Sequence, residues 1–321
     1  MAVMGRRTAL WKAAAWGAVG GTLPDLDALI DFGDPVSNMT YHRAESHALF
    51  WLTAASLPIG WAVARASGEA ALWRRWWLAI WLVLVTHPLL DAMTVYGTQL
   101  LLPFTDHPFG VGSIFIIDPL YTLPLLAGVV VALRRGDERG LAWNRFGLLA
   151  SCAYLGWTAA AQAWVRHEVE RELQAQGIAA TQVLVTPAPF NTLLWRVVAI
   201  DGDDRYHEGF RSLLDGARPL RLDAFPRGTA LRAGYADNWY LQRMVWFTRG
   251  FYKLERDDGG VVVTDLRMGQ EPAYVFAFHL PRPRPAAPAA PPRAVGGRQD
   301  IARGLQWLGP RMLGADLPPP R

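Results

Sequence analysis

The stretch Thr86-His87-Pro88-Leu89-Leu90-Asp91-Ala92-Met93-Thr94 ends one apolar run and opens the following loop. His87 and Asp91 are four residues apart, so on a helix they point to nearly the same side. An imidazole nitrogen and a carboxylate oxygen placed in this way can bind one divalent metal ion. Because Pro88 would kink a helix interior, we expect the pair to lie where the apolar helix breaks and restarts.

The amino-acid composition indicates a membrane protein. Of the 321 residues, 51% are hydrophobic and 19% are charged, whereas soluble domains carry about 25% charged residues. The net charge is only +4, and no basic patch is interleaved with aromatic residues, so nothing specific indicates nucleic-acid binding. The single cysteine, Cys152, excludes both an intramolecular disulfide and a cysteine-rich zinc site.

Five apolar stretches in the first half are predicted to form a multi-span α-helical membrane bundle. They cover approximately residues 8–23, 48–64, 72–90, 113–133 and 141–165. Basic residues precede the first stretch and follow the second and the fourth: Arg6, Arg7, Arg65, Arg74, Arg75, Arg134, Arg135, Arg139 and Arg145. Because basic loops stay in the cytoplasm, we expect a cytoplasmic N-terminus and an extracytoplasmic chain after residue 165.

The character of the chain changes after residue 165. Residues 166–182 are polar and are expected to form a connecting helix. Residues 183–280 contain short strand-like runs separated by Gly, Asp and Pro, which predict a small soluble α+β domain with one antiparallel sheet. Residues 281–321 begin with a segment rich in Pro, Ala and Arg and are predicted to form a largely disordered tail.

Three groups of polar residues lie at the predicted outer ends of the apolar stretches. Charged and imidazole groups near a membrane boundary are costly unless they are paired or bound to an ion. Histidines together with carboxylates suit zinc, manganese or a similar cation. The groups consist of Asp25 and Asp27, of His42, Arg43 and His47, and of His87 and Asp91.

Asp118 lies slightly inside the fourth apolar stretch, directly before Pro119. A buried acid at this position needs a partner. That partner is the metal, a ligand imidazole that the acid orients, or a helix break at Pro119.

In combination these elements resemble the YdjM-type membrane-bound metal-dependent hydrolases. The elements are Leu-Pro-Asp-x-Asp at 23–27, His-Arg-x-x-x-His at 42–47, His-x-x-x-Asp-x-x-Thr-x-x-Gly at 87–97 and Asp-Pro at 118–119. The similarity covers about residues 15–160, and residues 189–195 with Tyr206 and Gly209 are similar to the outer domain of longer members. Ala44 and Ala48 depart from the expected Gly and Ser or Thr, which concerns loop geometry rather than metal ligands.

The resemblance implies an inner-membrane protein with a metal site. It also suggests distant kinship to the helical zinc phospholipases C and zinc nucleases, which hydrolyse phosphate esters. On this interpretation the ion, zinc by preference, is bound first of all by His42, His47, His87 and Asp91.

The other polar residues then take further roles. Asp25 and Asp27 complete a second metal position or act as general base. Arg43 holds a substrate phosphate, and Asp118 orients a metal-binding imidazole.

Structural interpretations stay open beside these roles. Asp25 and Asp27 can form a polar turn, Arg43 can be an interfacial residue, and Asp118 can cap a helix. The main hypothesis for the chain is an inner-membrane hydrolase whose partners are the bilayer and a phosphate-ester or lipid-linked substrate, with no nucleic acid. The alternative is a non-enzymatic membrane scaffold whose outer domain binds a protein partner, and a third option is a soluble helical bundle.

Overall fold

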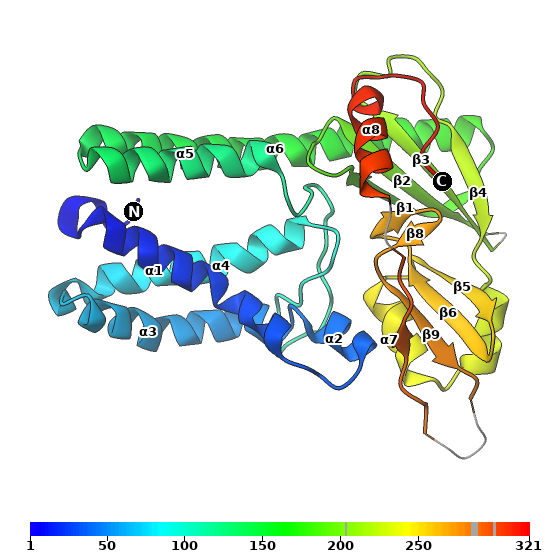
Figure 1. Cartoon of the computed structure of the whole chain (residues 1–321), viewed down its shortest axis with the longest axis horizontal. Coiled ribbons are helices and arrows are strands. Elements are labelled where there is room, and N and C mark those ends of the chain that lie inside the picture. Colours follow the sequence, from blue (N-terminus) through cyan, green and yellow to red (C-terminus); the bar gives the residue numbers. More distant parts are fainter. Residues whose placement is uncertain (203, 284–287, 298–299) are drawn as a thin grey trace. The chain divides into compact units, whose positions relative to one another are not determined.

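The computed structural model describes residues 1–202, 204–283, 288–297 and 300–321, which form two compact units. Unit 1 contains residues 1–30, 42–111 and 116–159, and unit 2 contains residues 31–41, 112–115 and 160–321. The chain, coloured along its sequence in Figure 1, therefore passes between the units more than once. The sequence instead predicts parts that are each continuous in the chain, with boundaries after residues 165, 182 and 280.

Unit 1 is helical, with an α-helix in each of the five apolar stretches. Its α-helices are α1 (Leu10–Thr22), α3 (Leu49–Ala66), α4 (Trp73–Met93), α5 (Pro119–Arg135) and the first part of α6 (Glu138–Ala175), and its 3-10 helices are η1 (Gly5–Arg7), η2 (Pro24–Leu29), η3 (Glu45–His47) and η4 (Ala70–Leu72). Among the described helices, two segments are long and apolar enough to cross a membrane, Leu49–Ala66 and Ala70–Met93. The 13 residues of α1 span about 20 Å, less than the roughly 30 Å of a bilayer core.

Helices α3 and α4 pack closely because a glycine faces the neighbouring backbone. A Cβ atom at Gly60 would lie 2.5 Å from Cα of Trp77, so a larger residue would push the helices apart. Trp77 Nε1 also donates to Ser56 Oγ at 3.0 Å. The surrounding core consists of Met4, Ala13, Leu52, Val63, Ala64, Trp76, Ile80 and Leu84.

The N-terminal segment is held at the turn between α3 and α4. Lys12 Nζ donates to the Ser67 carbonyl at 2.9 Å and lies 3.4 Å from the Glu69 carboxylate. Thr8 Oγ1 donates to the same carboxylate at 2.8 Å. The lysine that interrupts the first apolar stretch therefore has polar partners within the bundle.

Helix α4 runs without a break through Pro88 to Met93. The predicted break was wrong, because a proline removes one backbone donor without preventing the next turn when the neighbouring residues stay packed. Leu84, Val85 and Ala92 on either side are buried. Helices α3 and α5 also contain an internal proline.

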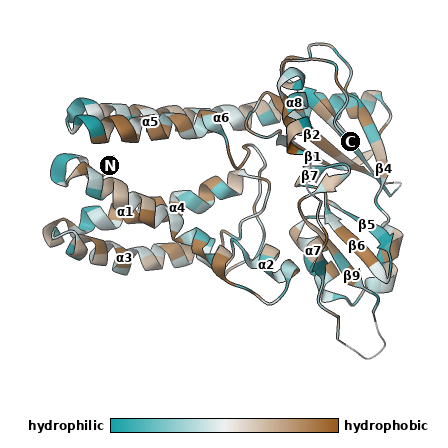
Figure 2. Ribbon diagram, viewed as in Figure 1, coloured by the Kyte–Doolittle hydropathy of each residue, from teal (hydrophilic) through white to brown (hydrophobic). Residues whose placement is uncertain are grey.

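Helices α5 and α6 approach each other along a row of small residues. A Cβ atom at Gly128 would lie 2.9 Å from the Trp143 carbonyl oxygen, and one at Gly140 would lie 3.0 Å from Cα of Ala132. Such rows let membrane helices come close enough for backbone contact. Figure 2 shows apolar residues along much of these two helices.

Unit 2 contains two four-stranded antiparallel sheets rather than the one sheet predicted. The first has the order β1-β2-β3-β4, the second has the order β10-β9-β6-β5, and β7 pairs with β8. The strands are β1 (Ala180–Pro187), β2 (Leu194–Asp201), β3 (Arg205–Ser212), β4 (Leu222–Pro226), β5 (Tyr252–Asp257), β6 (Gly260–Asp265), β7 (Gly269–Gln270), β8 (Ala273–Tyr274), β9 (Ala277–Pro281) and β10 (Arg293–Ala294). The helices η5 (Thr229–Tyr235) and α7 (Trp239–Phe247) interrupt the run of strands between β4 and β5, which separates the sheets.

The second half of α6 packs on the first sheet of unit 2. Ala161, Val165, Val169 and Leu173 recur every four residues and are buried with residues of β1 and β2, as expected for an amphipathic helix. Helix α6 has 38 residues and contains the predicted fifth apolar stretch together with the first ten residues of the connecting helix predicted at 166–182. Residues 180–182 belong to β1 instead. A shorter helix of this unit, α2 (Pro35–Tyr41), packs near α7.

The segment after residue 281 is more ordered than the predicted tail. Strand β10 pairs with β9, and α8 (Ile301–Met312) packs Trp307, Leu308 and Met312 against buried residues of the first sheet. Both guanidinium Nη atoms of Arg311 donate to the Asp215 carboxylate, at 2.6 and 2.7 Å. Residues 284–287 and 298–299, to which the same prediction applied, lie outside the described residues.

Candidate metal centre

Four side chains from three separate segments meet in unit 1. Asp25 lies in η2, His47 in η3, and His87 and Asp91 lie one turn apart in α4. One ligand atom of each lies within 4.8 Å of the others. Among the described residues, these four side chains form the group of histidines and acids that could hold a metal ion. The i, i+4 pair of the sequence analysis thus forms half of a cluster.

Four of the separations between these atoms are those expected between neighbouring ligands of one small metal ion. Asp91 Oδ2 lies 3.2 Å from His47 Nε2 and 3.3 Å from His87 Nε2, and Asp25 Oδ1 lies 3.4 and 3.3 Å from the same nitrogens. Zinc binds nitrogen and oxygen ligands at about 2.0–2.1 Å. Neighbouring ligands at that radius in a tetrahedron lie about 3.3–3.4 Å apart, which agrees with these four separations. The two remaining pairs, Asp25 with Asp91 and His47 with His87, lie within 4.8 Å.

Three of these atoms are buried and have no hydrogen-bond partner: His47 Nε2, His87 Nε2 and Asp91 Oδ2. Unpaired buried polar atoms cost free energy, and a cation at their centre would satisfy all three. The Asp25 side chain, in contrast, is 51% exposed. The cluster is therefore accessible to solvent on the side of Asp25.

Arg43 lies beside Asp91, and its side chain is buried. Its Nη2 atom is 3.2 Å from Asp91 Oδ1, and its Nη1 atom donates to Thr94 Oγ1 at 3.3 Å. Only 5% of the residue is exposed. Arg43 therefore neutralises one oxygen of Asp91 and leaves the other facing the two histidines.

Asp27 organises the loop that carries the histidines. Its Oδ1 atom lies 2.8 Å from His42 Nδ1, and its Oδ2 atom accepts from Arg43 N at 2.9 Å and from Ser46 Oγ at 2.5 Å. Burial alone would raise the pKa of this carboxyl, but its interactions with His42 and His47 and its hydrogen bonds from Ser46 and the Arg43 backbone hold it well below its usual range. Both oxygens of this ionised carboxylate are thus engaged within the loop.

The His47 imidazole responds to the same negative charges. Burial alone would lower its pKa, but the nearby carboxylates of Asp27 and Asp91 raise it above the ordinary value. The carboxylates therefore favour a positive charge at this point, which either a proton or a metal ion can supply.

His42 and Asp118 do not belong to the group of four. The His42 ring lies next to it, 5.9 Å from the His47 ring centre, but its Nδ1 atom is bonded to Asp27. Asp118 caps α5, where its oxygens accept from Leu120 N at 2.9 Å and from Tyr154 Oη at 2.8 Å. The structure therefore favours the capping interpretation of Asp118.

The loop after α4 is tied to the residues around the cluster. Gln99 N donates to the Arg43 carbonyl at 2.9 Å, and Leu49 N donates to the Leu100 carbonyl at 2.9 Å. Gly97 has a φ of +113°, a conformation that residues with a Cβ atom rarely adopt. The glycine of the His-x-x-x-Asp-x-x-Thr-x-x-Gly element thus has a backbone role.

Ser46 contacts the cluster but was missed in the sequence analysis. Its Oγ atom lies 2.8 Å from His47 Nδ1 as well as 2.5 Å from Asp27. The available signal was its place directly before His47, where a hydroxyl can reach the neighbouring ring in a tight turn.

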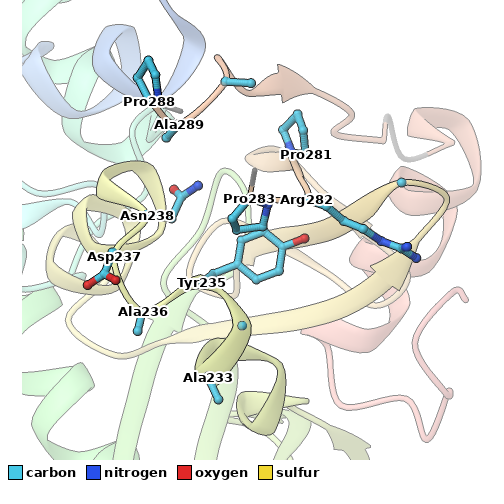
Figure 3. A pocket seen from close by; sticks show the side chains of 13 residues that line it. Ala233, Tyr235, Ala236, Asp237, Asn238, Pro281, Arg282, Pro283, Pro288 and Ala289 are labelled. Carbon is cyan, nitrogen blue, oxygen red and sulfur yellow. The ribbon is translucent and has the colours of Figure 1, made fainter. Parts of the chain in front are cut away.

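Unit 2 contains a separate hollow, seen in Figure 3. It is lined by Tyr235, Asn238 and Arg282 together with Asp237 and neighbouring small residues and prolines. Its lining, taken over the described residues, includes no histidine or cysteine. The hollow therefore presents no group of metal ligands comparable to the cluster of unit 1.

Residues 1–165 match the family described as YdjM inner membrane protein, which is just over half of the chain. No curated protein and no solved structure was found to match the chain. The matched range includes all four side chains of the cluster. The family description gives a location in the inner membrane and does not name a reaction.

Proposed function

The chain belongs to the YdjM inner membrane protein family, and on this premise we propose that it is a metal-dependent hydrolase of phosphate esters. The observation that carries the proposal is the convergence of four ligand atoms, three of them buried and unpartnered. In this assignment Asp25, His47, His87 and Asp91 bind the ion. Two imidazoles with two carboxylates suit zinc, the metal that we prefer.

Two further roles, accepting a proton from water and positioning a metal ligand, are assigned to residues of the cluster and its neighbours. A bound zinc ion would lower the pKa of a water ligand to about 7 and polarise a phosphoryl oxygen. Because a catalytic zinc ion keeps one position open for water, the half-exposed Asp25 is the ligand that would leave the ion and accept a proton from the water that replaces it. Because Arg43 is buried against Asp91 and Thr94, we assign it to positioning Asp91 rather than to binding substrate phosphate.

Exposed apolar side chains support placing the helices of unit 1 in the bilayer. A soluble protein rarely exposes so many large apolar residues on neighbouring helices. On α5 and the first part of α6 they are Leu120, Leu123, Leu126, Leu133, Trp143, Phe146, Leu148, Leu149 and Trp157. We assign five spans to α1, α3, α4, α5 and the first part of α6, of which α1 is the shortest.

The distribution of basic residues supports an orientation. Lys12 joins the N-terminal segment to the turn between α3 and α4, so Arg6, Arg7, Arg65, Arg74 and Arg75 belong to one end of the bundle. By the positive-inside rule this end is cytoplasmic. The cluster, which lies after α1, before α3 and at the end of α4, is then extracytoplasmic, as is unit 2.

The place of the cluster suggests the kind of substrate. Its ligands lie after α1, before α3 and at the end of α4, which in the proposed five-span arrangement is where the bilayer meets water. A phosphate ester attached to a lipid would present its phosphate at that depth while its chain stays in the membrane. We therefore favour a lipid-linked phosphate ester over a freely soluble one.

Metal analysis of the full-length protein purified in detergent tests the site. We expect about one zinc ion per chain in the wild type and close to none in a variant with His87→Ala and Asp91→Ala. His167→Ala, which removes an exposed histidine of α6, is the matched control and keeps the metal. Equal metal contents in all three proteins would remove the basis of the proposal.

A second measurement tests the reaction. The wild type should hydrolyse bis(p-nitrophenyl) phosphate or a phospholipid in mixed micelles, lose this activity with a chelator and regain it with zinc. A protein that binds zinc but cleaves neither compound would favour a structural role for the metal.

A non-enzymatic scaffold is the second candidate function. It is favoured by the large apolar side chains that unit 2 exposes on different elements, Phe190, Leu214, Trp239 and Val275. A partner that cross-links to residues 183–280 equally well in the wild type and in the variant with His87→Ala and Asp91→Ala would support it.

A further inference from the structure

Ser46 stands between the Asp27 carboxylate and the His47 imidazole. Its Oγ atom is 2.5 Å from Asp27 Oδ2 and 2.8 Å from His47 Nδ1. The direct separation of His47 Nδ1 and Asp27 Oδ2 is 3.5 Å, which is beyond the usual range of a hydrogen bond. The shorter path from the carboxylate to the ring therefore runs through the hydroxyl.

The direction of these hydrogen bonds follows from counting protons. A serine hydroxyl has one proton to donate and can accept at its oxygen. An ionised Asp27 only accepts, so Ser46 donates to Asp27 and accepts from the Nδ1–H group of His47. The Nε2 atom of a neutral His47 then carries the lone pair, and this is the buried atom without a partner that faces Asp25, His87 and Asp91.

We propose that Ser46 is a positioning residue that fixes His47 in its Nδ1-protonated tautomer and so prepares Nε2 to bind the metal. The inference rests on the proposed metal site. Asp27 acts on His47 through this hydroxyl, because its other oxygen is bonded to His42. Loss of a group that orients a ligand imidazole typically lowers metal affinity 10–100-fold.

Zinc affinity, measured by competition with a chelator on the full-length protein in detergent, tests the proposal. Ser46→Ala should bind zinc roughly 10–100-fold more weakly, and Ser46→Thr, which keeps a hydroxyl, should stay close to the wild type. Ser37→Ala is the matched control, because Ser37 Oγ also donates to a carboxylate, that of Asp34, at 2.5 Å. Its affinity for zinc should not change.

A double-mutant cycle separates the path through Ser46 from a direct pair between Asp27 and His47. If the hydroxyl transmits the effect, the double variant Asp27→Asn, Ser46→Ala should be no weaker than the worse of the two single variants. Additive losses would show that Asp27 acts on His47 independently of Ser46.

Nitrogen NMR of metal-free protein with labelled histidine supplies a spectroscopic readout. At a pH that keeps the ring neutral, His47 should be the Nδ1-protonated tautomer in the wild type and a mixture of tautomers in Ser46→Ala. A wild type that binds no zinc would overturn the proposed function together with this inference. A wild type that binds zinc, with unchanged affinity and tautomer in Ser46→Ala, would overturn the inference alone.

Discussion

Buried charge is arranged differently in the candidate metal cluster of unit 1 and in the ion pairs of unit 2. In unit 2 the guanidinium groups of Arg196, Arg267 and Arg311 lie 2.5–2.7 Å from the carboxylates of Glu208, Asp265 and Asp215. In unit 1 two imidazoles and two carboxylates converge, and three of their buried atoms have no hydrogen-bond partner.

This difference separates buried charges that stabilise a fold from buried charges that are arranged to bind a cation. A buried ion pair with complementary geometry satisfies itself, and breaking it costs much more than leaving it in place. A group of lone pairs that face one another is stable only with a positive charge among them. The pairs of unit 2 therefore indicate structure, and the cluster of unit 1 indicates a ligand.

The largest effect is expected when one buried pair of unit 2 is broken. Asp215→Ala would leave the Arg311 guanidinium buried without its carboxylate and should lower the free energy of unfolding of unit 2 by about 3–5 kcal/mol. Hydrogen exchange should report opening of α8. Asp316→Ala is the control, because its partner Arg221 is 72% exposed, and it should cost about 1 kcal/mol or less. If both variants lowered the free energy of unfolding equally, the buried pair would be no more important to the fold than the exposed one.

Zinc should stabilise unit 1 and leave unit 2 unchanged. At a free concentration 100 times the dissociation constant, zinc adds about 2.7 kcal/mol to the free energy of unfolding of the unit that binds it. Hydrogen exchange of α4 and η3 should slow by about 100-fold, while exchange of β2 and β3 should not change. Slower exchange in both units, or in His87→Ala, would contradict binding at the cluster.

Acid should destabilise unit 2 through its paired carboxylates. Burial would raise the pKa values of Glu208 and Asp215, but hydrogen bonds and charge from Arg196 and Arg311 lower both. Because the folded pKa lies below the unfolded value of about 4, their contribution is complete above about pH 5 and is lost as the pH falls further. The slope reaches about 1.4 kcal/mol per pH unit for each group.

Unfolding titrations of unit 2 between pH 7 and pH 3 measure this slope. Asp215→Asn removes one titrating group and should give a shallower dependence than the wild type. An unchanged slope in the variant would show that the pair with Arg311 does not control acid stability.

The smallest effect concerns a carboxylate of unit 1 that has its own partners. Asp118→Ala should lose a helix cap worth about 1 kcal/mol and keep its full zinc content. Asp118→Asn should lose less, since asparagine is also a good cap. Zinc loss in either variant would place Asp118 in the metal site after all.

The features that depend on residues close together in the chain could be predicted from the sequence. The five apolar stretches each contain a helix, because a helix satisfies the backbone hydrogen bonds of a long apolar run within the run itself. The pairing of His87 with Asp91 follows from the spacing of an α-helix and is present in α4.

The choice among nearby polar residues could not be predicted. His42 and His47 stand in one short loop, and only His47 contributes to the group of four. Between them Arg43 adopts a φ of +64°, a left-handed turn that redirects the chain and that no residue pattern announces for arginine. Which of Asp25 and Asp27 faces the centre depends on the same loop.

The sequence by itself determined the helical character of the first half, the helical pair of ligands and the concentration of basic residues near particular helix ends. These depend on periodicity and composition within a few turns of chain. Only the tertiary structure decided which acids and imidazoles meet, that the strands divide into two sheets, and that α8 is held by Arg311 and Asp215. Such contacts join residues far apart in the chain, so their energies depend on packing that no local pattern contains.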